Sequence, residues 1–330
     1  MSGQASRERD ADLRLSSAGR LPAVREVFGY MVTARLGMGA RSVIYAVVEP
    51  GTRKKYALKR VLRTDPALDD PCIEQVKVEY EVSRHFEHPR LRKTHRLMIR
   101  RKWMFFGIEE VGLLMDLVEG RSLVDRNDYS FSMLLEIFHQ AAEGLAALHK
   151  TGYLHADMKP HNIIVGPDRK VTLVDFGQSC RIGTAKTRIQ GTPDYIAPEQ
   201  IDKLTLDVRT DVYNFGATMY WALTGRNIPT RLQALLNTKA VVAGRPGAIP
   251  KPSEFNKAVP GPLDALVLQC IRDDRRERPL DMNEVTARLQ PVLADALAAE
   301  VKPLPPGQIV NLGLEDTIAG QGLDDSVPGL

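Results

Sequence analysis

The sequence predicts an α+β fold in which strands dominate the N-terminal part and helices dominate the C-terminal part. Apolar runs at 30–36, 43–48 and 54–61 have the length of strands, and a Gly-rich turn separates the first two. Between residues 131 and 150, apolar residues recur at i, i+3, i+4 and i+7, the spacing of a helix with one buried face. This change of spacing predicts that strands and helices occupy separate parts of the chain.

The composition is that of an ordinary folded chain of 330 residues, with 43% hydrophobic and 26% charged residues. The formal net charge of +4 is too small to indicate nucleic-acid binding. No apolar run reaches 18 residues, so we expect no membrane-spanning helix. The three cysteines show no paired spacing, which argues against a disulfide framework or a zinc site and favours a cytoplasmic location.

Both ends of the chain lack a regular apolar pattern. Residues 1–27 are mostly polar and predict a disordered arm rather than a secretory signal. Residues 299–330 are rich in Pro and Gly and predict a disordered tail.

The Gly-rich turn lies between two predicted strands, at 30–36 and 43–48. Gly37 and Gly39 would allow backbone amides to approach phosphate oxygens closely. A dinucleotide-binding fingerprint needs a helix after its glycines, and here a strand follows. Two glycines alone are also compatible with an ordinary flexible hairpin.

The third predicted strand carries a lysine on an otherwise apolar face. Ala57, Lys59 and Val61 alternate with Tyr56, Leu58 and Arg60, so Lys59 shares its face with small and branched apolar residues. A buried ammonium requires an anionic partner. The next segment, 71–88, is predicted as a helix, and it carries the carboxylates of Glu74, Glu79, Glu81 and Glu87.

Residues 90–102 form a basic run, which is interpreted either as a solvated strand connection or as a docking patch for acidic partners. We favour the solvated connection. Two antiparallel strands are predicted next, Trp103–Phe106 and Val111–Met115, with a turn around Glu109 and Glu110.

A loop at 155–162 precedes a predicted strand–turn–strand hairpin at 163–174. Pro160 makes this segment a shaped loop rather than a helix. The hairpin should bring Asp157, Asn162 and Asp175 to one place. Two of these side chains could bind a hard divalent cation through oxygen, and one could accept a proton.

Three further helices are predicted, at 211–223, 262–272 and 281–298. The first is almost entirely apolar and should therefore be buried. Thr210 or Asp211 would cap its start, and Gly225 would end it.

Residues 155–177 resemble the catalytic loop and metal-binding segment of the eukaryotic-type serine/threonine protein kinases, and the chain is similar to bacterial members of that family. The family pattern is His-Arg-Asp, four residues, Asn, and then Asp-Phe-Gly on the next strand. His155, Asp157, Asn162 and Asp175 match it, whereas Ala156 stands where the family has Arg.

The resemblance covers residues 28–298 and implies a two-lobed fold, with a small lobe at 28–118 and a large lobe at 119–298. ATP and Mg²⁺ would lie in the cleft between the lobes. Asp157 and Lys159 would act at the transferred phosphoryl group, and Asn162 and Asp175 would bind the metal. Glu79 would hold Lys59 towards the phosphates, with Glu81 as the alternative. The implied nucleotide-binding residues are Leu36, Gly37, Gly39, Ile44, Ala57, Lys59, Glu79, Met115, Asp116 and Val118.

Residues 191–199, which end in Ala-Pro-Glu, resemble the close of a kinase activation segment. The resemblance implies a protein substrate with a Ser or Thr hydroxyl and a contact of Thr192 with Asp157 and Lys159. Autophosphorylation would fall on Thr184 or Thr187. The resemblance also implies a structural ion pair between Arg278 and Glu199.

Two alternatives remain beside a serine/threonine protein kinase. A pseudokinase scaffold would bind nucleotide without turnover, but all the expected polar residues are present. A small-molecule phosphotransferase would lack the segment at 191–199.

In relatives, the Arg at the position of Ala156 pairs with an activation-segment phosphate. We therefore expect activity here to depend less on phosphorylation of Thr184 or Thr187.

Overall fold

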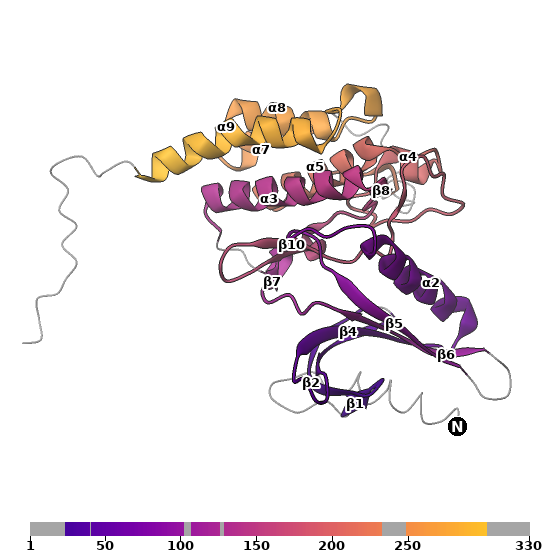
Figure 1. Cartoon of the computed structure of the whole chain (residues 1–330). Coiled ribbons are helices and arrows are strands. Elements are labelled where there is room, and N and C mark those ends of the chain that lie inside the picture. The colour runs from indigo at the N-terminus through magenta and orange to yellow at the C-terminus, as the bar shows by residue number, and fades with distance from the viewer. Residues whose placement is uncertain (1–23, 40, 102–106, 126–128, 233–248, 302–330) are drawn as a thin grey trace, which may run out of the picture.

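The structure, a computed structural model, describes residues 24–39, 41–101, 107–125, 129–232 and 249–301. An antiparallel sheet with one helix forms a small lobe, and the remaining described helices form a large lobe (Figure 1). The two-part α+β fold predicted from the sequence is confirmed.

The sheet of the small lobe has six strands in the order β1-β2-β3-β4-β6-β5. Its core is formed by two clusters, one around Tyr45 and Leu58 and one around Val61 and Leu113. Helix α2 packs against β4, β5 and β6. The strands are β1 (Glu26–Val27), β2 (Tyr30–Met38), β3 (Val43–Val48), β4 (Lys55–Leu62), β5 (Thr94–Arg101) and β6 (Ile108–Met115).

The predicted turn around Glu109 and Glu110 is wrong, because both residues lie within β6. Glu110 is buried and pairs with Arg60 of β4 across the sheet, with 2.6 Å between Oε1 and Nε. Two adjacent glutamates therefore occupy a strand because one of them has a cation opposite it. The predicted strand Trp103–Phe106 lies outside the described residues.

Helix α2 spans Pro66–Ser83 rather than 71–88. Asp65 caps it by accepting a hydrogen bond from the Ala67 amide at 3.1 Å, and Pro66 occupies the first helical position, where no amide hydrogen is needed. The backbone leaves the helix at Arg84, so the start and the end both lie about one turn earlier than predicted.

The large lobe has one continuous core, in which α3 packs against α9 and α5 against α8. Figure 1 shows these four helices on the far side of the molecule from β1–β4. The helices are α3 (Phe131–Lys150), α4 (Pro198–Ile201), α5 (Val208–Thr224), α7 (Pro252–Phe255), α8 (Gly261–Cys270) and α9 (Met282–Val301). The short strands are β7 (Arg121–Ser122), β8 (Tyr153–Leu154), β9 (Ile163–Val165), β10 (Val171–Leu173) and β11 (Cys180–Arg181), and single 3₁₀ turns occupy Leu123–Asp125, Pro160–Asn162 and Arg275–Glu277.

Helix α5 begins one turn before its predicted start. Asp207, not Thr210 or Asp211, caps it by accepting a hydrogen bond from the Arg209 amide at 2.8 Å. Thr210 and Asp211 lie in the first turn and are buried. Gly225 ends the helix with φ of 68°, as predicted, since glycine adopts this left-handed conformation without strain.

The segment between α2 and β5 joins the two lobes. Leu91 forms a parallel β-bridge with Leu173, the last residue of β10. The Arg92 amide donates to the Leu173 carbonyl at 3.0 Å, and the Leu173 amide donates to the Arg90 carbonyl at 2.7 Å. Among the described helices, none combines the length and the apolar character that a membrane crossing requires.

Candidate active site

The loop at 155–162 is held by the start of α5. Both oxygens of Asp211 accept backbone hydrogen bonds, from the His155 amide at 2.8 Å and the Ala156 amide at 2.7 Å. His149 Nε2 lies 2.7 Å from the same carboxylate. Because Ala156 adopts a left-handed φ of 58°, the loop conformation is strained and needs this support.

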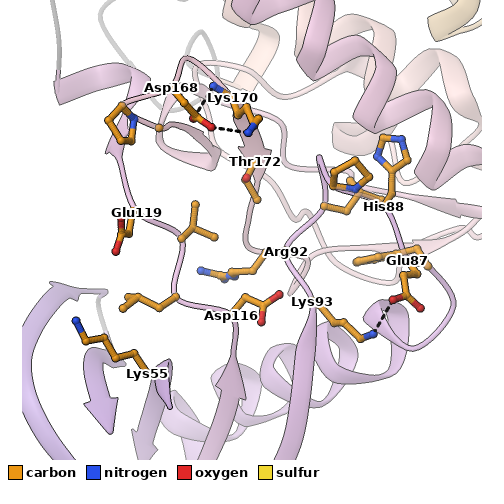
Figure 2. Close-up of a pocket in the computed structure, with 17 residues that line it drawn as sticks. Lys55, Glu87, His88, Arg92, Lys93, Asp116, Glu119, Asp168, Lys170 and Thr172 are labelled. Atoms are coloured by element: carbon orange, nitrogen blue, oxygen red, sulfur yellow. Dashed lines mark hydrogen bonds and ion pairs between the residues drawn. The ribbon is translucent and has the colours of Figure 1, made fainter. Parts of the chain in front are cut away.

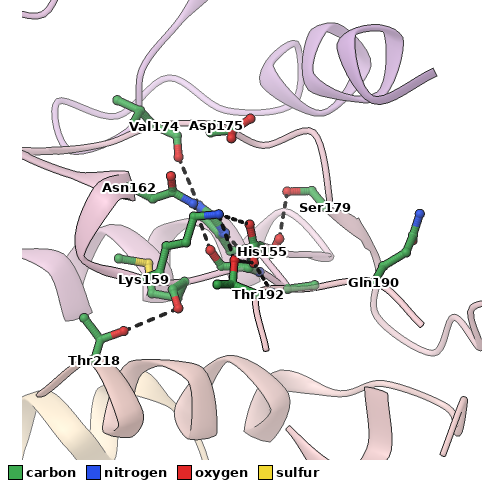
Figure 3. A network of polar contacts seen from close by, with 12 residues as sticks. His155, Lys159, Asn162, Val174, Asp175, Ser179, Gln190, Thr192 and Thr218 are labelled. Atoms are coloured by element: carbon green, nitrogen blue, oxygen red, sulfur yellow. Dashed lines mark hydrogen bonds and ion pairs between the residues drawn. The ribbon is translucent and has the colours of Figure 1, made fainter. Parts of the chain in front are cut away.

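Asp157 occupies a fixed position between two activation-segment contacts and a lysine. Its Oδ1 accepts hydrogen bonds from the amide and the hydroxyl of Thr192, both at 2.8 Å. Its Oδ2 lies 2.7 Å from Lys159 Nζ, which also donates to Thr192 Oγ1 at 2.8 Å. Figure 3 shows Lys159 of this loop next to Thr192. The structure thus brings together the three residues for which the sequence implied catalytic roles.

Asn162 and Asp175 are the candidate metal ligands. Asn162 is buried and donates from Nδ2 to the Asp157 carbonyl at 2.8 Å. The Asp175 side chain is 42% exposed, so its carboxylate is open to a ligand. One carboxylate and one carboxamide suit Mg²⁺, which usually binds one or two carboxylates and takes its other ligands from phosphates and water. The described residues contain no cluster of three His, Cys, Asp or Glu side chains that would compete as a metal site.

Lys59 connects the two lobes. Its Nζ lies 2.9 Å from Glu79 Oε2 on α2 and 3.0 Å from Asp175 Oδ1 after β10. Burial favours the neutral amine, but the two carboxylates prevail and raise the pKa of Lys59 above its ordinary value. The Lys59 ammonium in turn holds the pKa of Asp175 well below its usual range. Glu81, the alternative partner, pairs instead with Arg84 on the exposed face of α2.

Six of the predicted nucleotide-binding residues lie on the neighbouring strands β2, β3, β4 and β6, namely Leu36, Gly37, Ile44, Ala57, Lys59 and Met115. Glu79 lies on α2, Gly39 lies in the turn after β2, and Asp116 and Val118 follow β6. Ile44 of β3 pairs with Gly37 of β2 on one side and with Lys59 of β4 on the other. Ala57 of β4 pairs with Met115, the last residue of β6. The Gly39 amide closes the turn by donating to the Ser42 carbonyl at 2.8 Å, and a Cβ at Gly39 would lie 2.9 Å from Ser42 Oγ.

A pocket of about 710 Å³ lies beside the connection between the lobes (Figure 2). Its lining includes Arg92, Asp116 and Val118 together with residues of the β9–β10 turn. None of Lys59, Asp157, Asn162 or Asp175 lines it. Of the implied nucleotide-binding residues, this pocket therefore shares only Asp116 and Val118 with the candidate active site.

The ion pair implied between Arg278 and Glu199 is present. The guanidinium donates two hydrogen bonds to the carboxylate, at 2.7 Å and 2.9 Å, and both side chains are buried. Thr210 Oγ1 also donates to Glu199 at 2.9 Å. This pair joins the end of the activation segment to the segment before α9.

Sequence reasoning missed a second set of residues that hold the activation segment. Gln200 Nε2 donates to the Ala156 carbonyl at 2.8 Å and to the Gln190 carbonyl at 3.2 Å. Its Oε1 accepts from Asn214 Nδ2 at 3.0 Å, and that amide also donates to the Tyr195 carbonyl at 2.7 Å. Asn214 is a usable signal in the sequence, because a carboxamide inside an apolar helix must find hydrogen-bond partners.

Sequence reasoning also missed Arg92. The basic run at 90–102 predicts solvated side chains, yet Arg92 is buried and donates from Nη2 to Glu79 Oε1 at 2.8 Å. The other described members of the run that lie on β5 are mostly exposed, as expected.

Comparison with known proteins agrees with this geometry. The chain is 26% identical over 278 residues to a probable serine/threonine-protein kinase of Clostridium acetobutylicum, covering 80% of this chain and 40% of the relative. It is 29% identical to the serine/threonine-protein kinase pkn2 of Myxococcus xanthus, covering 82% of this chain and 32% of the relative. It is 28% identical to the serine/threonine-protein kinase PknL of Mycobacterium tuberculosis, covering 82% of this chain and 66% of the relative.

The chain thus spans between about one third and two thirds of the length of these relatives. A family model described as the protein kinase domain matches residues 30–288, which is more than half of the chain. The chain therefore belongs to the protein kinase domain family.

Proposed function

We propose that the chain is a serine/threonine protein kinase, which transfers the γ-phosphoryl group of ATP to a Ser or Thr hydroxyl of a protein. The observation that carries this proposal is the position of Asp157, whose two oxygens are held by Lys159 and Thr192. A carboxylate so oriented can align a substrate hydroxyl and accept its proton as the hydroxyl oxygen attacks phosphorus. Lys159 would lie near the transferred group and offset its charge.

Lys59 would bind the α- and β-phosphates of ATP, and Glu79 would keep its ammonium in place. The raised pKa of Lys59 supports this role, since the residue stays charged at neutral pH. Asn162 and Asp175 would hold Mg²⁺, which when bound neutralises charge on the phosphate oxygens. The residues proposed around the rest of the nucleotide are Leu36, Gly37, Gly39, Ile44, Ala57, Met115, Asp116 and Val118.

Two observations favour a protein substrate over a small molecule. The segment ending at Glu199 is anchored by a buried ion pair, and Thr192 within it reaches the proposed catalytic base. The relatives named above are all described as serine/threonine-protein kinases.

The free cysteines Cys72, Cys180 and Cys270 support a cytoplasmic location.

We propose further that Thr184 or Thr187 is an autophosphorylation site whose phosphate is not needed to order the activation segment. Ala156 offers no guanidinium to such a phosphate. The neutral amides of Gln200 and Asn214 instead tie the segment to the catalytic loop and to α5.

The proposal is tested by incubating the purified chain with γ-labelled ATP, Mg²⁺ and a peptide library that contains Ser, Thr or Tyr. We expect label on Ser and Thr peptides and its loss in Lys59→Met. Lys77→Met is the matched control, because Lys77 makes a solvent-exposed ion pair with Glu74 on α2. A chain that binds Mg²⁺–ATP but labels no peptide would be a pseudokinase, and label on a sugar or antibiotic alone would indicate a small-molecule phosphotransferase.

A further inference from the structure

The interface between α2 and β5 contains a buried polar layer, formed by Glu79 and Ser83 of α2, Arg92 before β5 and Thr94 of β5. Each of these residues is at most 9% exposed. The hydroxyls of Ser83 and Thr94 are hydrogen-bonded to each other, and Arg92 is bonded to Glu79. Polar contacts in a buried layer require defined distances and angles, whereas apolar side chains can slide past one another. This layer therefore fixes the position of α2 along the sheet.

Glu79 is fully buried between two cations. Its Oε2 faces Lys59 Nζ at 2.9 Å, and its Oε1 faces Arg92 Nη2 at 2.8 Å. Lys59 is shared, because it also contacts Asp175 at 3.0 Å. Two carboxylates and two cations make a neutral cluster, whereas without Arg92 a single ammonium would have to balance two carboxylates. Leaving one charge of a buried set unbalanced is strongly unfavourable.

The two cations on Glu79 come from differently anchored parts of the chain. Lys59 lies in the middle of β4 and moves with the small-lobe sheet. Arg92 is bonded through its backbone amide to Leu173, two residues before Asp175. Arg92 Nε is buried and has no hydrogen-bond partner among the described residues, so Glu79 is the group that orients this guanidinium. Figure 2 shows Arg92 between Asp116, which follows β6, and Thr172 of β10.

We infer that Arg92 is a positioning residue, which holds α2 and Glu79 against β10, the strand that precedes Asp175, before any nucleotide binds. Without Arg92, Glu79 would be held by Lys59 alone, whose ammonium is shared with Asp175. Arg92 bonds Glu79 through its side chain and Leu173 of the large lobe through its backbone, so it holds the Glu79 carboxylate in place relative to both lobes. Lys59 and Asp175 then meet in the arrangement proposed for phosphate transfer. This inference rests on the proposed function for its effect on catalysis, but not for its effect on α2.

The experiment compares Arg92→Met with Arg60→Met. Arg60 is the matched control, because it is similarly buried and pairs with the buried Glu110. It follows Lys59 on β4, but alternate side chains of a strand point to opposite faces of the sheet, so its guanidinium lies on the other face from the Lys59 ammonium. Two quantities are measured on the whole chain: hydrogen exchange of residues 73–83 without nucleotide, and kcat/KM for ATP. Arg92→Gln, which keeps a hydrogen-bond donor but not the charge, replaces Arg92→Met if that variant does not fold.

We expect Arg92→Met to raise exchange in α2 and to lower kcat/KM at least about ten-fold, because the buried carboxylate of Glu79 would lose one of its two cations. Arg60→Met should alter exchange in β4 and β6 but leave both α2 and kcat/KM unchanged. Arg92→Lys, which keeps the charge, should recover most of both losses. Equal α2 exchange and equal kcat/KM in Arg92→Met and Arg60→Met would overturn the inference. A wild-type chain that transfers no phosphate would refute the proposed function, and α2 exchange would then decide the role of Arg92.

Discussion

At the scale of single residues, Asp211 shows how a buried carboxylate stabilises a strained loop. It is inaccessible to solvent and accepts hydrogen bonds from two loop amides while contacting His149. Burial by itself would raise the pKa of Asp211, but the hydrogen bond from His149, the charges of His149 and His155 and the loop amides outweigh burial and hold the pKa below its ordinary value. The ionised form is therefore the form that the fold favours.

This pKa shift sets the direction of a stability change with pH. A carboxylate whose pKa is lower in the folded state stabilises the fold above its unfolded pKa of about 3.9, and this contribution is lost as pH falls below that value. We expect Asp211→Asn to reduce the free energy of unfolding by about 1–3 kcal/mol at pH 7, and the difference from wild type to shrink below about pH 4. Urea unfolding at several pH values measures this.

Asp202→Asn serves as the control, since Asp202 makes a solvent-exposed ion pair with Arg231. It should change the stability little at any pH. A stability difference between Asp211→Asn and wild type that stayed constant from pH 7 to pH 3 would contradict the assigned role.

Some residues of the candidate site could be predicted from the sequence, and others could not. Lys59, Asp157 and Asp175 could be predicted because each lies a set number of residues from a turn or a strand end. Folding does not change this separation along the chain. Arg92 could not be predicted in this way, because it lies in a run of cations whose other members are mostly solvated. Its burial depends on meeting Glu79 from another element, which no local pattern encodes.

At the scale of elements, helix α3 and strand β3 have the bounds that the sequence predicts, because the apolar pattern of the helix and the apolar run of the strand begin and end with the element. The starts of α2 and α5 were misplaced by one turn. In both cases an aspartate upstream of the apolar pattern caps the helix, Asp65 for α2 and Asp207 for α5. Such a first turn carries few apolar residues, so periodicity alone does not reveal it.

The activation segment, residues 178–199, is the element whose regulation the structure addresses. We predict that phosphatase treatment leaves most of the activity in place, because the Gln200 and Asn214 amides order this segment without a phosphate. Mass spectrometry before and after treatment establishes that Thr184 and Thr187 carry no phosphate when activity is measured.

Gln200→Leu removes these hydrogen bonds and should lower the rate of transfer about ten-fold, the effect of losing roughly 1.4 kcal/mol. Gln269→Leu on α8 is the control, because its contacts with Glu277 and Arg288 lie outside the segment. Abolition of activity by phosphatase would argue against an ordering role for the neutral amides.

At the scale of the whole molecule, three contacts tie the two lobes together around the candidate site. Lys59 of the small lobe bonds Asp175 of the large lobe, Leu91 pairs with Leu173, and Phe86 packs against Phe176 with 5.0 Å between ring centroids. The fold class was predictable because strand spacing changes to helix spacing along the chain. The contacts between the lobes were harder to predict from the sequence, since they join residues more than 80 positions apart.

The most direct test of the account concerns Asp157, on which the chemistry depends. The rate of γ-phosphoryl transfer to a Ser or Thr peptide is measured per folded protein for wild type, Asp157→Asn and the control Asp202→Asn. We predict that Asp157→Asn lowers the rate at least about 10²-fold, as expected for a lost general base, and that Asp202→Asn leaves the rate unchanged. A wild-type rate in folded Asp157→Asn would contradict the central claim.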